Sequence, residues 1–305
     1  SVGLIFPILE LKLFLNIKKG KRKRLYSLLL GIITGIGYLL KPQTSIMLIA
    51  ILMWEFLQLL FEKRKTELDK KIFIGMVILC IIGLKGTSYI PNVICNSLNI
   101  ALDTNKEFGM THFIMMGMNP DTEGVYSLSD CEYSASFSNR EERKKAEINM
   151  IKKRLNNYGI KGYAELLNKK LLTTYGDGTF AWGLEGGFWK EILPQKNNGI
   201  SEITRKIYYE TGEHYNKFMI YMQFFWIMIL FLQCFSCGKN NKDEIYIVYL
   251  SMIGLLSFEL LFESRARYLY TFSPVFILLA VGGLKNIRTF AKSININCKR
   301  LSNIL

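Results

Sequence analysis

Long apolar runs separated by short polar stretches dominate the chain, and this pattern predicts helices that cross a membrane. A helix needs about 20 apolar residues to span a bilayer. The runs cover residues 1–15, 25–40, 44–61, 72–95, 215–236, 245–262 and 268–284. The first run is short and lacks the charged start and cleavage site of a signal peptide. We therefore expect it to be the second half of a span that begins upstream of Ser1.

The second and third runs are separated by only Lys41, Pro42 and Gln43. Proline disfavours helical backbone in the residue before it, so the preceding helix is expected to end at this point. The two runs are also short for membrane spans. The sequence therefore predicts a tight helical hairpin.

Basic residues collect in four clusters, and the clusters predict how the spans are oriented. Six lie in residues 18–24, five in 63–71, two in 239–242 and five in 285–300. If all seven spans are real, these clusters fall on one side, whereas the opposite short loops carry only Lys41, Arg265 and Arg267. Cytoplasmic loops are rich in lysine and arginine, so the side with the clusters is expected to be cytoplasmic.

The fold class that follows is an all-α multi-span membrane protein with a mostly helical extracytoplasmic loop domain. Its expected parts are membrane spans in residues 1–95, the loop domain in 96–214, three spans in 215–285 and a cytoplasmic basic tail in 286–305. The expected location is the cell membrane.

The loop domain shows three amphipathic stretches that predict helices. The first begins with Ser138 as its cap, has Glu141 in the capping-box position and runs to about residue 157. The second covers residues 163–174, and the third covers 200–209 and returns the chain to the membrane.

The composition argues against nucleic-acid binding and against a metal site. Half of the residues are hydrophobic and the net charge is +14, but the basic residues lie at the ends of apolar runs. This placement favours a lipid bilayer as partner over nucleic acid. The chain has two histidines, and its six cysteines lack zinc-site spacing, so no metal site is expected. A disulfide between Cys95 and Cys131 is compatible with the predicted topology but is not established by the sequence.

Three charges lie in the short turn between the last two spans, and they are the main candidates for a binding site. Charge is costly near hydrocarbon, and the guanidinium groups of Arg265 and Arg267 match phosphate oxygens. Lys41 is expected on the same side. If the helix continues, Glu259, Glu263 and Arg267 share one face, either as a structural ion pair or as carboxylates that orient the arginine.

A second set of candidates lies in the loop domain. The glycine-rich aromatic stretch at residues 174–189 contains Asp177, Trp182 and Glu185. Aromatic rings beside carboxylates are suited to holding sugars, but they also form belts at the membrane interface. His112 is a candidate acid–base or hydrogen-bonding group, or a structural histidine.

Two segments, GYLLKPQTSIMLIA at residues 37–50 and ESRARYLYTFSPVFILLAVGGL at 263–284, resemble the membrane-embedded GT-C glycosyltransferases. The resemblance is closest to bacterial relatives of the protein mannosyltransferase and arabinose-transferase group. The stretches beginning THFIMMGMNP at residue 111 and YGDGTFAWGLEGGF at residue 175 are similar to an outer loop of such proteins.

The resemblance implies inverting transfer of a sugar from a polyprenyl-phosphate-linked donor to a cell-envelope glycan or protein on the outer face. It implies that Arg265 or Arg267 contacts the donor phosphate, with Lys41 as a second contact. The catalytic carboxylate would lie upstream of Ser1. No cofactor is identified, and the need for a divalent metal stays open. The alternatives are a lipid-linked polysaccharide polymerase or ligase, a non-enzymatic transporter of lipid-linked glycans, and a purely structural membrane protein.

Overall fold

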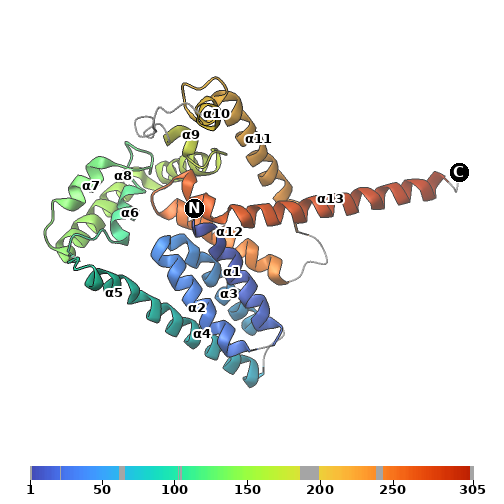
Figure 1. Cartoon of the computed structure of the whole chain (residues 1–305), viewed down its shortest axis with the longest axis horizontal. Helices are drawn as coiled ribbons and strands as arrows, with labels where there is room; N and C mark the ends of the chain where they lie inside the picture. The colour runs from blue at the N-terminus through green and yellow to red at the C-terminus, as the bar shows by residue number, and fades with distance from the viewer. Residues whose placement is uncertain are drawn as a thin grey trace. The chain divides into compact units, whose positions relative to one another are not determined.

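The computed structural model describes residues 2–20, 22–61, 66–101, 103, 105–185, 199–237 and 243–302 (Figure 1). Every regular element in these residues is a helix, which confirms the all-α class. The α-helices are α1 (Ile5–Lys18), α2 (Lys23–Leu40), α3 (Ser45–Phe61), α4 (Glu67–Ser88), α5 (Ile90–Ser97), α6 (Met110–Met116), α7 (Leu128–Ala135), α8 (Arg140–Tyr175), α9 (Trp182–Glu185), α10 (Gly199–Tyr208), α11 (Tyr215–Gln233), α12 (Asp243–Leu261) and α13 (Ser273–Ser302). Among the described residues, the 3-10 helix η1 (Val2–Leu4) precedes α1, η2 (Pro42–Thr44) joins α2 to α3, and η4 (Ala266–Phe272) joins α12 to α13.

In the part of the chain that the structure describes, six helical segments are long and apolar enough to cross a membrane, so the chain is a multi-span membrane protein. They are Lys23–Leu40, Pro42–Phe61, Glu67–Ser97, Tyr215–Gln233, Glu244–Leu261 and Ala266–Thr289. The first run of the sequence forms only the 14-residue helix α1, which is too short to be counted with them.

The predicted hairpin between α2 and α3 is confirmed. Lys41 leaves the helix with extended backbone (φ −153°, ψ 114°), and Pro42 opens the 3-10 turn η2. The Thr44 hydroxyl donates to the Lys41 carbonyl at 2.9 Å and closes the turn.

Helices α2 and α4 pack with their backbones in contact because glycines face each other. A Cβ atom on Gly31 would lie 2.7 Å from the Cys80 Cα, and one on Gly83 would lie 2.6 Å from the Ile32 nitrogen. Gly31 and Gly35 form a G-x-x-x-G pair, which is a common helix-contact pattern in membranes. The Cys80 thiol crosses the contact and donates to the Ser27 carbonyl at 3.3 Å.

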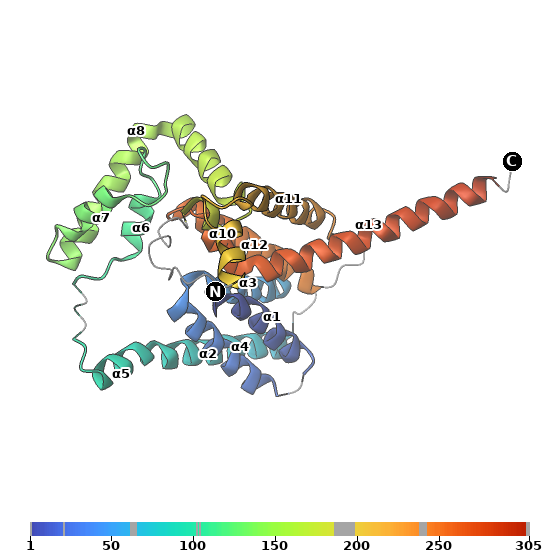
Figure 2. The ribbon, with the colours of Figure 1, turned by 45° about the horizontal axis from the view of Figure 1, so that its top comes forward.

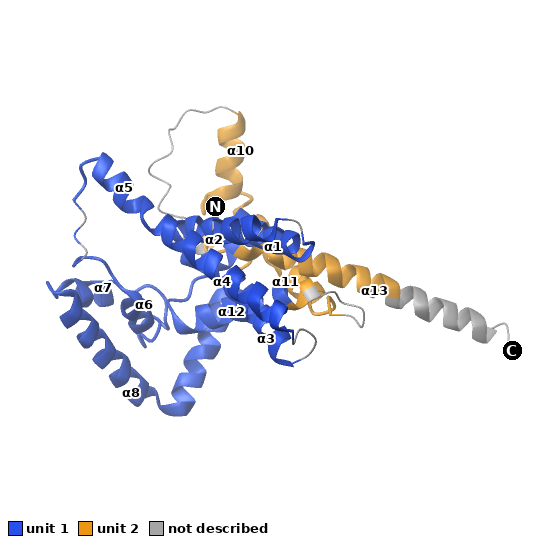
Figure 3. Ribbon diagram, turned by 90° about the horizontal axis from the view of Figure 1, so that it is seen from below, with its two compact units in different colours: residues 1–176, 247–271 blue, residues 177–246, 272–305 orange. Residues whose placement is uncertain are grey.

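The chain divides into two compact units (Figure 3). Unit 1 contains residues 1–176 and 247–271, and unit 2 contains residues 177–246 and 272–305. Unit 1 therefore holds α1–α8 with most of α12, and unit 2 holds α9–α11 and α13.

Helix α8 bends at Gly159, where the backbone (φ 58°, ψ −170°) leaves the helical region (Figure 2). Only glycine adopts this conformation without steric cost. The bend separates the two helices that the sequence predicts for this region. The predicted cap is wrong by one residue, because the side-chain Oδ1 atom of Asn139, rather than Ser138, accepts the Glu141 backbone N–H at 2.8 Å.

The first half of α8 is attached to α6 and α7 by buried arginines. Arg154 makes a two-pronged ion pair with Asp130, at 2.9 and 2.7 Å, and also donates to the Met115 carbonyl. Asn119 donates to the same carboxylate at 3.0 Å. Paired planar groups of this kind fix orientation as well as distance, so this half of α8 has a defined position within unit 1.

In unit 2, α11 packs along α13. The Trp226 and Phe276 rings meet edge to face at 4.9 Å, and Asn286 donates to the Phe235 carbonyl at 2.9 Å. A Cβ atom on Gly283 would clash with the Leu232 carbonyl, so this contact also requires a glycine.

Candidate functional site

The candidate site in unit 1 is built where α12 ends. The Lys170 ammonium group, on the second half of α8, donates to the carbonyls of Gly117, Leu260 and Phe262 at 2.9, 2.7 and 2.7 Å. Two of these carbonyls belong to the last turn of α12 and the residue after it. A lysine that satisfies the final carbonyls ends a helix and fixes the direction of the chain that leaves it.

Lys170 explains why the predicted face of Glu259, Glu263 and Arg267 does not form. A continuing helix would need the Leu260 carbonyl to accept the Ser264 backbone N–H. Lys170 occupies that carbonyl, and the Ser264 N–H donates instead to the Gly124 carbonyl at 2.9 Å. The helix ends at Leu261, and the expectation of one helical face is therefore wrong.

Two glycines let the loop after α6 reach this helix end. A Cβ atom on Gly117 would lie 2.5 Å from the Phe262 carbonyl oxygen. Gly124 has a positive φ of 80°, and a Cβ there would lie 2.7 Å from the Gly117 carbonyl oxygen. Both positions therefore require glycine.

The non-helical turn brings Glu263 and Arg265 together. The Arg265 Nε atom lies 3.0 Å from a Glu263 carboxylate oxygen, and both side chains are largely buried. The Tyr268 hydroxyl donates to the other carboxylate oxygen at 3.0 Å. The Arg265 guanidinium also lies over the Tyr126 ring, 5.4 Å from its centre. The ion pair therefore joins Glu263 to Arg265, whereas the sequence pattern placed Glu263 beside Arg267.

Arg267 is exposed and lies over the Tyr268 ring, 5.3 Å from its centre. The structure brings it close enough to Lys41 for their charges to interact. Burial is the largest cause that lowers the pKa of Lys41, the positive charge of Arg267 lowers it further, and Glu259 opposes the shift. Two predicted phosphate ligands from turns far apart in the sequence are therefore within electrostatic range of each other.

Glu259 is buried, with 1% of its surface exposed, and lies within electrostatic range of Lys41. Within the described residues, neither of its carboxylate oxygens makes a hydrogen bond of ordinary geometry. A buried carboxylate attracts positive charge, and Lys41 and Lys170 are the cations that act on it. The cluster of Lys41, Arg265, Arg267, Glu259 and Glu263 is called the α12 cluster below.

His112 does not belong to the α12 cluster. It is 1% exposed, at the start of α6, and its Nδ1 atom lies 2.7 Å from the Ser134 hydroxyl oxygen. Burial is the largest cause that lowers the pKa of His112, although Glu147 and Asp130 act in the opposite direction.

The remaining predicted sugar contacts lie in unit 2. The Asp177 carboxylate folds back on its own loop and accepts the backbone N–H groups of Thr179 and Ala181 at 2.8 and 2.6 Å. The Trp182 ring packs against Tyr208 and Phe218 within an aromatic cluster. The Glu185 side chain lies outside the part of the chain that the structure describes.

Cys95 and Cys131 are free thiols, so the disulfide that the sequence allowed is not formed. Within the described residues, no group of three or more histidine, cysteine, aspartate or glutamate side chains is arranged to hold a metal ion.

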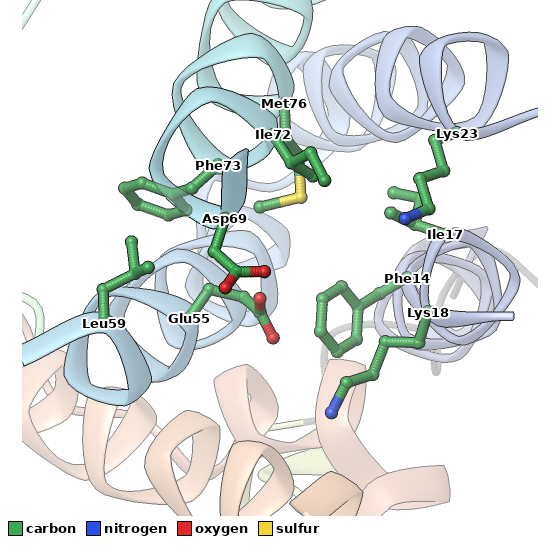
Figure 4. Close-up of a pocket in the computed structure, with 10 residues that line it drawn as sticks. All are labelled: Phe14, Ile17, Lys18, Lys23, Glu55, Leu59, Asp69, Ile72, Phe73 and Met76. Carbon is green, nitrogen blue, oxygen red and sulfur yellow. The ribbon is translucent and has the colours of Figure 1, made fainter. Parts of the chain in front are cut away.

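A separate cavity of about 140 Å³ opens among α1–α4 of unit 1 (Figure 4). Its polar walls come from Lys18, Lys23, Glu55 and Asp69, with apolar residues such as Phe14 between them. Lys23 begins α2, whereas Lys41 follows its last residue. The cavity and the α12 cluster are therefore at opposite ends of this helix.

Sequence reasoning missed Lys170, Gly117 and Gly124. Lys170 reads as an ordinary basic residue of an amphipathic helix, and its carbonyl partners lie up to 92 residues away. The glycines offered a weak signal, because they frame the turn-rich segment at residues 117–124.

One family model matches residues 6–286, and its description is conserved hypothetical integral membrane protein. No curated protein and no solved structure matches the chain.

Proposed function

Since the chain belongs to the family of conserved hypothetical integral membrane proteins, we propose that it acts on a lipid-linked substrate at the membrane surface. The substrate is a sugar carried on polyprenyl phosphate, and the reaction is transfer of that sugar to a cell-envelope glycan or protein. The site is the α12 cluster, and the chain resides in the plasma membrane with this site and residues 96–214 on the outer side.

The observation that carries the proposal is that Lys41 lies within electrostatic range of both Arg267 and the buried Glu259. The α12 cluster combines three cations with two carboxylates, so it retains net positive charge. Arg267 is exposed and lies over the Tyr268 ring, so its guanidinium is accessible to a ligand. A phosphate group on a lipid fits this charge, and the membrane delivers the lipid to the same depth.

In the proposed reaction, an acceptor hydroxyl attacks the anomeric carbon of the sugar with inversion, and the bond to the lipid phosphate breaks. Arg265 and Arg267 stabilise the negative charge that develops on the leaving phosphate. A donor aimed at such charge typically contributes about 3 kcal/mol. Glu263 positions Arg265 for this role through the ion pair at 3.0 Å. The base that deprotonates the acceptor is not assigned to a residue of this chain.

The test is binding of a polyprenyl phosphate to the whole chain in lipid nanodiscs, with the phosphate-free polyprenol as the reference ligand. The Arg267→Ala variant is expected to lose at least about tenfold in affinity for the phosphate, because a charged hydrogen bond contributes about 1.5–3 kcal/mol. Its affinity for polyprenol should not change.

The matched control is Arg140→Ala, because Arg140 is exposed and its partner Glu107 lies 3.8 Å away. This variant should bind both lipids as the original chain does. Equal affinity for polyprenol and polyprenyl phosphate, or an unchanged affinity in Arg267→Ala, would rule out the proposed site.

A further inference from the structure

Four side chains, two of them on α7, form a hydrogen-bonded row from a buried carboxylate to a thiol. The Glu147 carboxylate accepts the Ser134 hydroxyl at 2.8 Å, and Ser134 lies 2.7 Å from His112 Nδ1. On the other side of the imidazole ring, Nε2 lies 3.9 Å from the Cys131 sulfur, within hydrogen-bond distance for sulfur. Glu147, Ser134 and His112 are each at most 1% exposed. These four residues are called the thiol relay.

The thiol relay selects one tautomer of His112. The Ser134 proton is donated to Glu147, so the Ser134 oxygen accepts a hydrogen bond from the N–H at His112 Nδ1. A neutral imidazole carries one proton, which leaves the lone pair on Nε2. That lone pair faces the thiol of Cys131. A nucleophile, a base and a group that orients the base are therefore arranged in sequence.

The ring of His112 is also held in place by its neighbours. Phe108 stacks on it at 4.2 Å between ring centres, and Phe113 packs edge-on at 5.1 Å. Thr111 donates to the second oxygen of Glu147, so both ends of that carboxylate are engaged. The base is therefore fixed by packing as well as by hydrogen bonds.

The thiol end of the relay reaches toward solvent. Cys131 is half-buried and free, and its side chain interacts with the hydroxyl of Tyr126, which is 46% exposed. That hydrogen bond is the largest cause that raises the pKa of Tyr126. The Arg265 guanidinium lies over the same tyrosine ring. A small electrophile at Cys131 would therefore meet a phenol, with a cation behind it.

We propose that Cys131 is a nucleophilic thiol that takes an acyl group from an ester or thioester, with His112 as its general base. This site goes beyond the proposed sugar transfer and uses separate reacting atoms. Acyl transfer is favoured over redox chemistry because it needs no oxidant and no second thiol. The Tyr126 hydroxyl lies beside the thiol, and a hydroxyl can donate to the carbonyl oxygen as that oxygen gains negative charge.

The step balances without another reactant. The thiol proton moves to His112 Nε2, and the sulfur attacks the carbonyl carbon and forms an S–C bond. The bond from that carbon to the alcohol oxygen then breaks, and the alcohol leaves with the proton from Nε2. A thioester on Cys131 and neutral His112 remain.

Burial favours the neutral form of His112, which is the form that acts as a base. It lowers the pKa of His112 below its usual value, so the imidazole is mainly neutral at pH 7. Glu147 and Asp130 oppose that shift and Arg143 adds to it. Only the neutral imidazole accepts the thiol proton.

The test uses the whole chain in nanodiscs with p-nitrophenyl acetate, and mass spectrometry locates the acetyl group on peptides. Cys95 is the internal reference, because it is a second free, half-buried thiol. We expect acetylation of Cys131 to be at least about 100-fold faster than that of Cys95, since general-base assistance contributes about 10²–10⁴-fold. His112→Gln should remove this advantage.

A pH profile of the unaltered chain makes the test independent of whether His112→Gln folds. Acetylation of Cys95 should rise about tenfold per pH unit, because only the thiolate of an unassisted thiol reacts. Acetylation of Cys131 should be nearly flat from pH 6.5 to 7.5. A profile for Cys131 that parallels that of Cys95, or equal rates at pH 7, would overturn the proposal.

Discussion

Replacing Lys170 by methionine is expected to destabilise unit 1 by at least about 3 kcal/mol, since each buried carbonyl left without a donor costs about 1–3 kcal/mol. The side chain is 1% exposed and is the donor to Gly117, Leu260 and Phe262. Methionine fills a similar volume but donates no hydrogen bond. The loss of stability therefore reports the three hydrogen bonds and not the packing of the side-chain stem.

Thermal and denaturant unfolding in detergent measure this loss, and Lys169→Met is the matched control. Lys169 is the neighbouring residue, about half exposed, and pairs with Glu123 at 2.6 Å. An exposed ion pair contributes about 0–1 kcal/mol. If both variants unfold alike, Lys170 does not join α8 to α12 in the way described.

Lys170 also gives unit 1 a pH-dependent stability. Burial lowers the pKa of Lys170 to about 8, below its ordinary value of 10.5. Between these values the unfolded chain binds more protons, so this residue makes the free energy of unfolding increase as the pH rises from about 8 toward 10.5. Below about pH 8 the folded and unfolded chains both bind the proton, so Lys170 adds no pH dependence to the free energy of unfolding. Comparing the original chain with Lys170→Met across this range should show the increase only in the former.

Replacing Gly31 by valine is expected to cost about 3 kcal/mol or more, at the top of the range for overpacked cores. Its new Cβ would lie 2.7 Å from the Cys80 Cα and would also clash with the Cys80 carbonyl oxygen. These are backbone atoms of a neighbouring helix, and no rotamer change relieves them. Helices α2 and α4 would have to separate along their whole contact.

Gly86→Val on α4 is the control, because no atom lies within 4 Å of a Cβ at that position. It should change the unfolding free energy by no more than about 0.5 kcal/mol. Unfolding curves of the two variants in the same detergent give the comparison. Equal stability would contradict the close approach of α2 and α4.

The spans were predictable because they depend on local hydrophobicity, and the Lys41–Pro42 hairpin because proline acts on its neighbour. The end of α12 was also predictable, because the apolar run stops at residue 262 and the helix ends at Leu261. What holds that end was not predictable, since Lys170 donates to the Leu260 carbonyl from 90 residues away. The glycine pair at Gly31 and Gly35 was readable as a helix-contact motif, although the motif alone does not identify α4 as the partner.

The candidate site was predictable in its residue types but not in its geometry. Arginines in a membrane turn indicate phosphate chemistry, whereas the meeting of Arg267 with Lys41 depends on how separate helices pack. The thiol relay was harder to foresee. Sequence showed an isolated histidine, and its partners Cys131 and Ser134 follow it by 19 and 22 residues without a recognisable motif.

The bend at Gly159 also has a consequence for how many residues α8 can contain. Arg154 attaches α8 to Asp130, and Lys170 attaches it to the end of α12. The bend lies between these two attachment points. Inserting or deleting one residue after the bend would rotate Lys170 by about 100° around the helix axis. Its ammonium group would then point away from the three carbonyls. Point substitutions on the exposed surface of this segment are therefore tolerable, whereas a change in the number of its residues is not.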